Sequence, residues 1–144
     1  MEAKKNIKIL IAEDDDGHAE LIKEALEESG VKNPVIRFKN GEQCWNYLED
    51  QIQAGYGGNH EYGFLILLDI NMPKMDGVEV LRRIKQNAKL KSIPVIMLTT
   101  TDDPREVEQC YEIGCNIYIT KPVDFQNFTE TLKRLGPFMQ IVQI

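Results

Sequence analysis

Four short apolar runs in this chain each end at a polar side chain, and this recurrence restricts the possible folds more than any other feature. The runs span 9–12, 64–68, 95–98 and 117–120, and they are followed by Glu13-Asp14, Asp69, Thr99 and Lys121. Branched apolar runs of this length are typical of buried strands in a parallel sheet. Sites in open α/β sheets form beyond the carboxyl ends of the strands. We therefore expect three acids, a hydroxyl and a lysine to converge on one pocket.

Strand-like and helix-like segments alternate along the chain. A fifth, shorter strand is expected at 35–38, and the helices are expected after the first run, at 41–52, after the cap Asp76, from Asp103-Pro104, and after the cap Asp124. Five strands alternating with five helices imply an α/β fold, a doubly wound five-stranded parallel sheet. In the flavodoxin-like order 2-1-3-4-5, the ends of strands one and three are neighbours at the switch point.

Helical spacing also predicts which side chains face the core. Leu21, Ile22, Ala25 and Leu26 are expected to face the core on the first helix, with His18 at the flank of that stripe, and Val107, Cys110 and Tyr111 on the fourth.

Length and composition indicate one soluble domain, at 1–136, followed by a short apolar tail at 137–144. The net charge of −6 argues against direct nucleic-acid binding, and no apolar stretch has the length of a membrane span. Three cysteines, at 44, 110 and 115, match no metal-ligand spacing and are expected as buried thiols. A cytoplasmic location is the simplest expectation.

The expected pocket has the chemistry of a magnesium and phosphoryl site. Two carboxylates 4 Å apart repel by about 4 kcal/mol at an effective dielectric near 20, and a cation relieves that repulsion. Mg²⁺ prefers carboxylates, waters and phosphate oxygens. Glu13 and Asp14 suit a metal-ligand role, the carbonyl of Asn71 could complete the shell, and Asp69 is the best candidate nucleophile toward phosphorus. Thr99 and Lys121 would contact the phosphoryl group.

These motifs resemble the receiver domain of two-component response regulators. The match rests on Glu13-Asp14, Asp69 within LLDINMPKMDG, Thr99 and Lys121-Pro122, and it covers essentially the whole chain. The resemblance implies that Asp69 accepts phosphate from a histidine kinase, that Mg²⁺ is held by Glu13, Asp14, Asp69 and the Asn71 carbonyl, and that Tyr118 is the switch aromatic. The acidic pair is Glu-Asp where many relatives have Asp-Asp.

The resemblance also carries narrower expectations. The loop at 54–63 and the LTT run after Pro94 look most like single-domain regulators that partner bacterial phytochromes. This implies a stand-alone regulator that works through protein contacts, with neither nucleic acid nor membrane as a partner, and that pairs through its last helix and tail. The Lys121–Pro122 bond is expected to be cis, as in receiver domains generally.

Other interpretations use the same residues. Asp14 or Asp15 could simply cap the first helix, Thr99 could be displaced by one within its run of threonines, and Tyr118 fits the core as well as a switch. An aspartate-nucleophile phosphatase would use the same Asp69, but Asn71 stands where that class has a general acid. A flavin-binding module shares the fold class, yet the acidic loop would repel the flavin phosphate. An interaction protein with an inactive site ranks below these.

Overall fold

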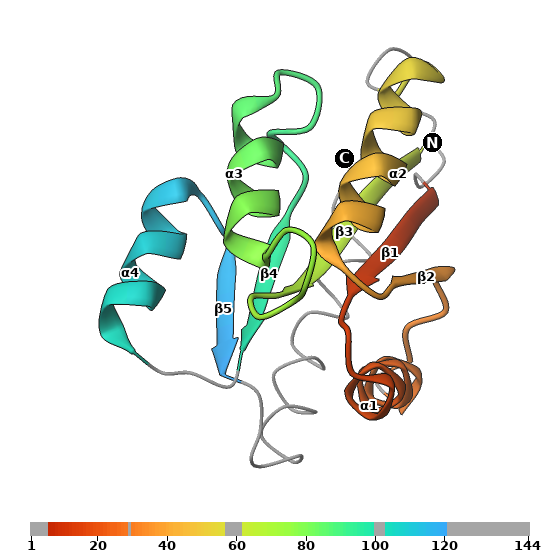
Figure 1. Cartoon of the computed structure of the whole chain (residues 1–144). Coiled ribbons are helices and arrows are strands. Elements are labelled where there is room, and N and C mark those ends of the chain that lie inside the picture. Colours follow the sequence, from red (N-terminus) through yellow and green to blue (C-terminus); the bar gives the residue numbers. More distant parts are fainter. Residues whose placement is uncertain (1–5, 29, 57–61, 100–102, 121–144) are drawn as a thin grey trace.

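The chain forms a five-stranded sheet flanked by helices in a computed structural model that describes residues 6–28, 30–56, 62–99 and 103–120 (Figure 1). The strands are β1 (Asn6–Ala12), β2 (Val35–Phe38), β3 (Tyr62–Asp69), β4 (Val95–Thr99) and β5 (Ile117–Thr120). The helices are α1 (Asp16–Glu28), α2 (Gly41–Gln53), α3 (Gly77–Gln86) and α4 (Pro104–Ile113). All neighbouring strands are parallel and the order is β2-β1-β3-β4-β5, so the predicted fold class is confirmed.

Each face of the sheet packs into its own core, because side chains alternate along the strands. Leu10, Ile66 and Leu68 belong to a cluster with side chains from α2, α3 and α4. Ile9 and Ile11 belong to a second cluster, which includes Ile22, Ala25 and Leu26 of α1. Helix α1 therefore covers one face and α2 to α4 cover the other, as Figure 1 shows. This is the doubly wound arrangement.

Short polar signals set the helix ends. Asp76 caps α3, where its carboxylate accepts the amide of Glu79 at 2.9 Å. Asp103 caps α4 and Pro104 occupies its first turn, while Gly114 ends that helix at φ 128°. These ends are where the sequence predicts them, because capping depends on contacts within one helical turn.

Two predicted buried positions are wrong. On α1 the buried stripe is Ala19, Ile22, Ala25 and Leu26, whereas Leu21 is 42% exposed; His18, expected at the flank of the stripe, is exposed. Tyr111 on α4 is 49% exposed, and its hydroxyl accepts the backbone amide of Tyr118 at 3.1 Å. On both helices the buried stripe is narrower than helical spacing predicts. Among the described residues, only the side chains that point directly at the sheet are buried.

Several predictions concern residues outside those the structure describes. These are Lys121, the isomer of the Lys121–Pro122 bond, the helix after Asp124, and the tail at 137–144. Among the described helices, none is both long and apolar enough to cross a bilayer.

Candidate functional site

Three carboxylates meet where strands β1 and β3 end. The two strands are neighbours with Ala12 opposite Leu68, so Glu13 and Asp69 leave the sheet side by side, and Asp14 follows. Ligand oxygens of Glu13, Asp14 and Asp69 all lie within 4.8 Å of one another. The structure thus brings together the three acids that the sequence places at strand ends.

The three acids differ sharply in exposure. Glu13 is completely buried and Asp69 is 4% exposed, whereas Asp14 faces solvent. Buried like charges this close are costly unless a cation neutralises them. The donors are all hard carboxylate oxygens, and one side is open to water, which suits Mg²⁺ better than zinc. Glu13, Asp14 and Asp69 are therefore the residues that would hold a divalent cation.

The loop between β3 and α3 fixes the direction of Asp69. Asp69 Oδ1 accepts the amide of Asn71 at 3.3 Å, Ile70 donates to the Leu98 carbonyl at 3.0 Å, and the Ile70 carbonyl accepts the amide of Gly77 at 2.9 Å. Gly77 has no room for a side chain, since an added Cβ would lie 2.2 Å from the Asp69 carbonyl oxygen. Asp69 is thereby held rigidly between strand and helix.

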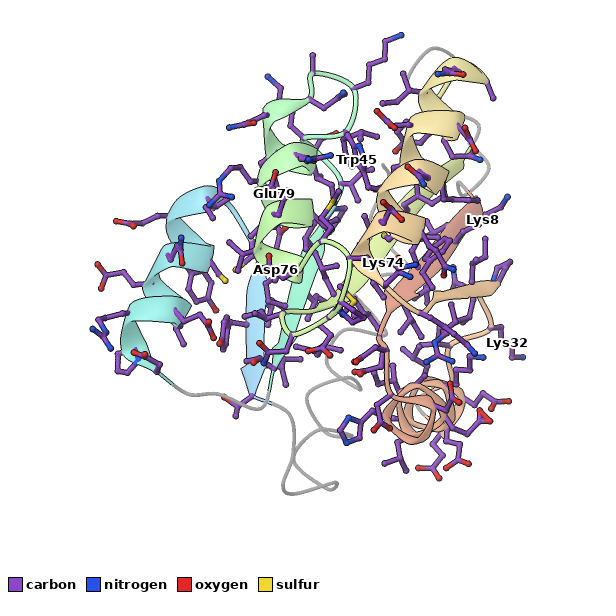
Figure 2. The ribbon with its side chains drawn as sticks, viewed as in Figure 1. Lys8, Lys32, Trp45, Lys74, Asp76 and Glu79 are labelled. Atoms are coloured by element: carbon purple, nitrogen blue, oxygen red, sulfur yellow. The ribbon has the colours of Figure 1, made fainter. Side chains whose placement is uncertain are left out.

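The same loop carries backbone strain. Lys74 and Met75 have φ values of 53° and 86°, a backbone region that residues other than glycine seldom occupy. The Lys74 carbonyl accepts the amide of Glu42 at 2.8 Å, so the strained turn is tied to the start of α2. Figure 2 shows Lys74 in this loop, with Asp76 and Glu79 at the beginning of α3. Strain that the surroundings maintain is common next to functional residues.

Thr99 and Tyr118 lie on the next two strands. Thr99 is completely buried at the end of β4, one register position beyond the pairing of Asp69 with Leu98. Tyr118 lies on β5, where its backbone pairs with Met97 of β4. Burial, followed by the negative charge of Glu106, raises the pKa of the Tyr118 phenol to about 12. Thr99 has a smaller, opposite effect and lowers the pKa of this phenol as a hydrogen-bond partner, so the two side chains are neighbours.

Two further residues approach the acidic cluster and were not identified from the sequence. His18 Nδ1 lies 3.9 Å from Glu13 Oε2. Arg37, on the edge strand β2, donates two hydrogen bonds to the Glu13 carbonyl and one to Asp16. A charged residue inside the apolar run VIRF was the available signal for Arg37, because such a residue needs a partner nearby.

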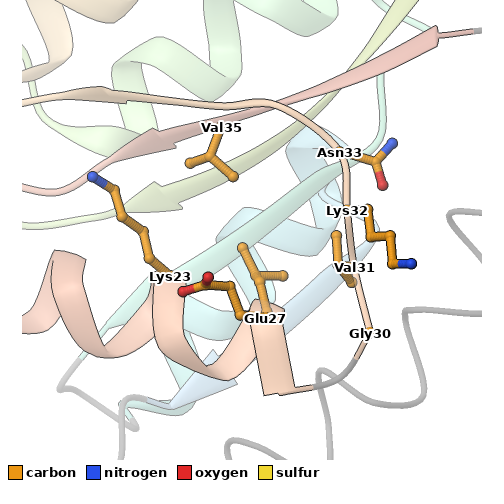
Figure 3. A pocket seen from close by; sticks show the side chains of 8 residues that line it. Lys23, Glu27, Gly30, Val31, Lys32, Asn33 and Val35 are labelled. Atoms are coloured by element: carbon orange, nitrogen blue, oxygen red, sulfur yellow. The ribbon is translucent and has the colours of Figure 1, made fainter.

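A separate hollow lies at the opposite end of α1 (Figure 3). It encloses about 450 Å³ and is lined by Lys23, Leu26, Glu27, Gly30, Val31, Lys32, Asn33 and Val35. The amide of Asn33 is already used, since it donates to the Ile7 carbonyl at 2.9 Å. None of these residues belongs to the acidic cluster, so this hollow is not part of the candidate metal site.

The parallel sheet and the cluster of three carboxylates at the ends of its strands define a class of protein. The family model for the response regulator receiver domain matches residues 9–133, and the chain belongs to that family. It is therefore a receiver-domain response regulator of two-component signalling, a signalling domain whose family pairs with histidine kinases and binds divalent metal.

Individual relatives refine the placement. Response regulator Rcp1 of Synechocystis is 36% identical over 130 residues, covering 90% of this chain and 86% of that protein. Its Mn²⁺-bound crystal structure has a TM-score of 0.77 at 34% identity and covers 94% of this chain and 95% of that one. A receiver domain from Rhodospirillum rubrum reaches 0.79 at 38% identity, with coverage of 95% and 96%.

A third relative is the phosphorylated cyanobacterial phytochrome response regulator RcpA. Its structure has a TM-score of 0.77 at 37% identity and covers 94% of each chain. The chain is thus close to phytochrome response regulators. Nothing in these relatives supports the phosphatase alternative.

Proposed function

We propose that Asp69 is the phosphoacceptor and that Mg²⁺, held by Glu13, Asp14, Asp69 and the Asn71 carbonyl, is required for the transfer. The observation that carries this proposal is the cluster of three carboxylates within 4.8 Å, two of them buried, beyond the carboxyl ends of the strands, where open α/β sheets bind their ligands. Among them Asp69 is central in the sheet, and its position is held by the contacts of Ile70 and Gly77.

The transfer is a displacement at phosphorus. A carboxylate oxygen of Asp69 attacks the phosphorus of a phosphohistidine, a P–O bond forms, and the P–N bond breaks with its electron pair left on the imidazole nitrogen. The bound cation would neutralise charge on the carboxylates and on the equatorial phosphoryl oxygens. Thr99 would donate its hydroxyl to one of those oxygens, and Lys121 would approach another.

The phosphoryl group would act as a switch through Thr99 and Tyr118. The Thr99 hydroxyl has one proton to donate, and the Thr99 side chain lies beside the Tyr118 phenol, whose pKa it lowers. A phosphoryl oxygen on Asp69 would compete for that hydroxyl, so Thr99 would move inward and Tyr118 would repack against α4. Such a charge-assisted hydrogen bond supplies about 1.5–3 kcal/mol.

A bacterial phytochrome is the kinase we propose. This rests on the likeness to Rcp1 and to the phytochrome response regulator RcpA. The phosphoryl group of a histidine kinase derives from ATP, so the proposed location of the transfer is the cytoplasm.

We also propose that two copies pair through the last helix and the tail. Five of the seven residues at 138–144 are apolar, and soluble monomers tend to avoid so apolar an exposed segment. Deletion of 137–144 should convert a dimer to a monomer in light scattering while Asp69 is still phosphorylated. A full-length protein that is monomeric at high micromolar concentration would exclude this pairing.

The experiment that tests the proposed function uses acetyl phosphate as a small-molecule donor. Intact-mass spectrometry should show a gain of one phosphoryl group in wild type with Mg²⁺, and no gain with EDTA or in Asp69→Asn. Asp76→Asn is the matched control, because Asp76 caps α3 and lies outside the acidic cluster. Undiminished labelling of Asp69→Asn would refute the assignment.

A further inference from the structure

The guanidinium of Arg37 forms hydrogen bonds with the segment from Glu13 to Asp16, which follows β1. Its Nε and Nη2 donate to the Glu13 carbonyl oxygen at 2.9 and 2.7 Å, and its Nη1 donates to Asp16 Oδ1 at 2.8 Å. Although β2 is an edge strand, the Arg37 side chain is only 15% exposed. We propose that Arg37 is a positioning residue, which holds the loop from Glu13 to Asp16 so that the carboxylates of Glu13 and Asp14 stay arranged for the cation.

Strand β2 holds Glu13 from both sides of its backbone. The amide of Glu13 donates to the Phe38 carbonyl at 3.0 Å, which extends the β1–β2 pairing one residue beyond Ala12. Arg37 donates hydrogen bonds to the Glu13 carbonyl, so the peptide plane between Glu13 and Asp14 is fixed. Because that plane sets where the Asp14 side chain begins, Arg37 acts on a metal ligand without touching its carboxylate.

The loop needs such a restraint. Three carboxylates within 4.8 Å repel one another before the cation binds, and Asp14 and Asp15, which precede α1, are exposed, so this loop has room to move outward. A planar guanidinium suits the task, because its fixed fork of donors loses little freedom on binding and stays charged at every physiological pH.

The ion pair of Arg37 with Asp16 and its hydrogen bonds to the Glu13 carbonyl contribute unequally to holding this segment. Asp16 is 78% exposed on its side chain, so the ion pair with Arg37 is screened by water and contributes little by itself. Arg37 nevertheless lowers the pKa of Asp16 through their hydrogen bond. The two hydrogen bonds to the Glu13 carbonyl are partly shielded from water and are the stronger contribution.

Magnesium titration calorimetry on the full chain tests this inference, which rests on the proposed metal site. Arg37→Met keeps the apolar stem and removes every donor, and Arg37→Lys keeps one charge without the fork. We expect the Mg²⁺ dissociation constant to rise about 10-fold in Arg37→Met, the lower end of what outer-shell partners contribute. Arg37→Lys should fall between Arg37→Met and wild type.

Arg83→Met is the matched control. Arg83 also bonds a carboxylate, that of Glu79, but on α3 beside Trp45, so its loss should leave Mg²⁺ affinity unchanged. Thermal unfolding without Mg²⁺ is recorded for each variant to separate stability from metal affinity. Wild-type affinity in folded Arg37→Met or Arg37→Lys would overturn the inference and leave the metal site standing. Failure of the wild type to bind Mg²⁺ would overturn both.

Discussion

Gly77 and Asp69 are in backbone contact: a Cβ atom added to Gly77 would lie 2.2 Å from the carbonyl oxygen of Asp69 and 2.9 Å from the Ile70 Cα. Helix α3 therefore begins against the last residue of β3. Backbone atoms this close cannot give way as a flexible side chain would. Because Gly77 has no side chain, the start of α3 packs directly against the backbone of Asp69, the candidate phosphoacceptor, and holds it in place.

Gly77→Ala should consequently destabilise the protein by about 1–3 kcal/mol, the range for an overpacked core site. Chemical denaturation measures this. Gly17→Ala is the control: its added Cβ meets only Asp15 Oδ1, at 3.2 Å, and alanine inside a helix gains up to about 1 kcal/mol over glycine. Equal stabilities for Gly77→Ala and wild type would show that the loop yields easily.

Adjacent acids at the start of α1 should behave in opposite ways. Asp14 belongs to the carboxylate cluster and is exposed, so Asp14→Ala should weaken Mg²⁺ binding and leave the metal-free melting temperature equal or higher. Asp15 Oδ1 instead accepts the amide of His18 at 2.9 Å, as a helix cap does. Asp15→Ala should lower the free energy of unfolding by about 0.5–2 kcal/mol and spare metal affinity.

Magnesium titration and thermal unfolding of both variants separate the two roles. If Asp14→Ala binds Mg²⁺ as wild type does, Asp14 is only part of the helix start.

Thr99→Ala should permit phosphorylation of Asp69 but weaken the response of a partner. The change removes the hydroxyl that, in the proposed switch, would couple a phosphoryl group on Asp69 to Tyr118. Thr99→Ser keeps the hydroxyl and should retain most of the response. Partner affinity is compared with and without acetyl phosphate, and an equal gain in Thr99→Ala and wild type would contradict the switch.

Burial of the three cysteines predicts loss of stability at alkaline pH. Burial raises the pKa of Cys44 to about 12, and burial chiefly raises those of Cys110 and Cys115 to about 11, whereas the unfolded thiols titrate near 9.0. The unfolded state therefore loses protons first. The stabilisation is complete below pH 9 and falls as pH rises toward about 12.

Denaturation at a series of pH values from 8 upward checks this slope. Cys44→Val, which keeps the site apolar, should remove part of it. A free energy of unfolding that stays constant across this range would contradict the expectation.

The sequence predicts features that depend on short-range rules. The caps at Asp76 and Asp103-Pro104 act within one helical turn, and strict alternation with right-handed crossovers leaves few strand orders, of which the observed one is the flavodoxin-like order. The meeting of Glu13 with Asp69 follows from that order, because neighbouring parallel strands end at the same edge.

Other features depend on contacts that spacing does not encode. Leu21 and Tyr111 match the spacing of a buried helical stripe, but both are exposed. Among the described residues, the sheet buries only the helix side chains that point at it. Arg37 lies 24 positions from its carbonyl partner Glu13, and only the β1–β2 register brings the two together. The hydrogen bond from Tyr118 to the Tyr111 hydroxyl likewise joins a strand edge to a helix.

If Asp69 is the phosphoacceptor, it forms an acyl phosphate that can be trapped chemically. Protein treated with acetyl phosphate and Mg²⁺ is reduced with borohydride, which converts an aspartyl phosphate to homoserine, and is then mapped by peptide mass spectrometry. We predict homoserine at position 69 alone, and none when EDTA is present. Homoserine at position 14 or 76 with Asp69 unmodified would show that Asp69 is not the phosphoacceptor.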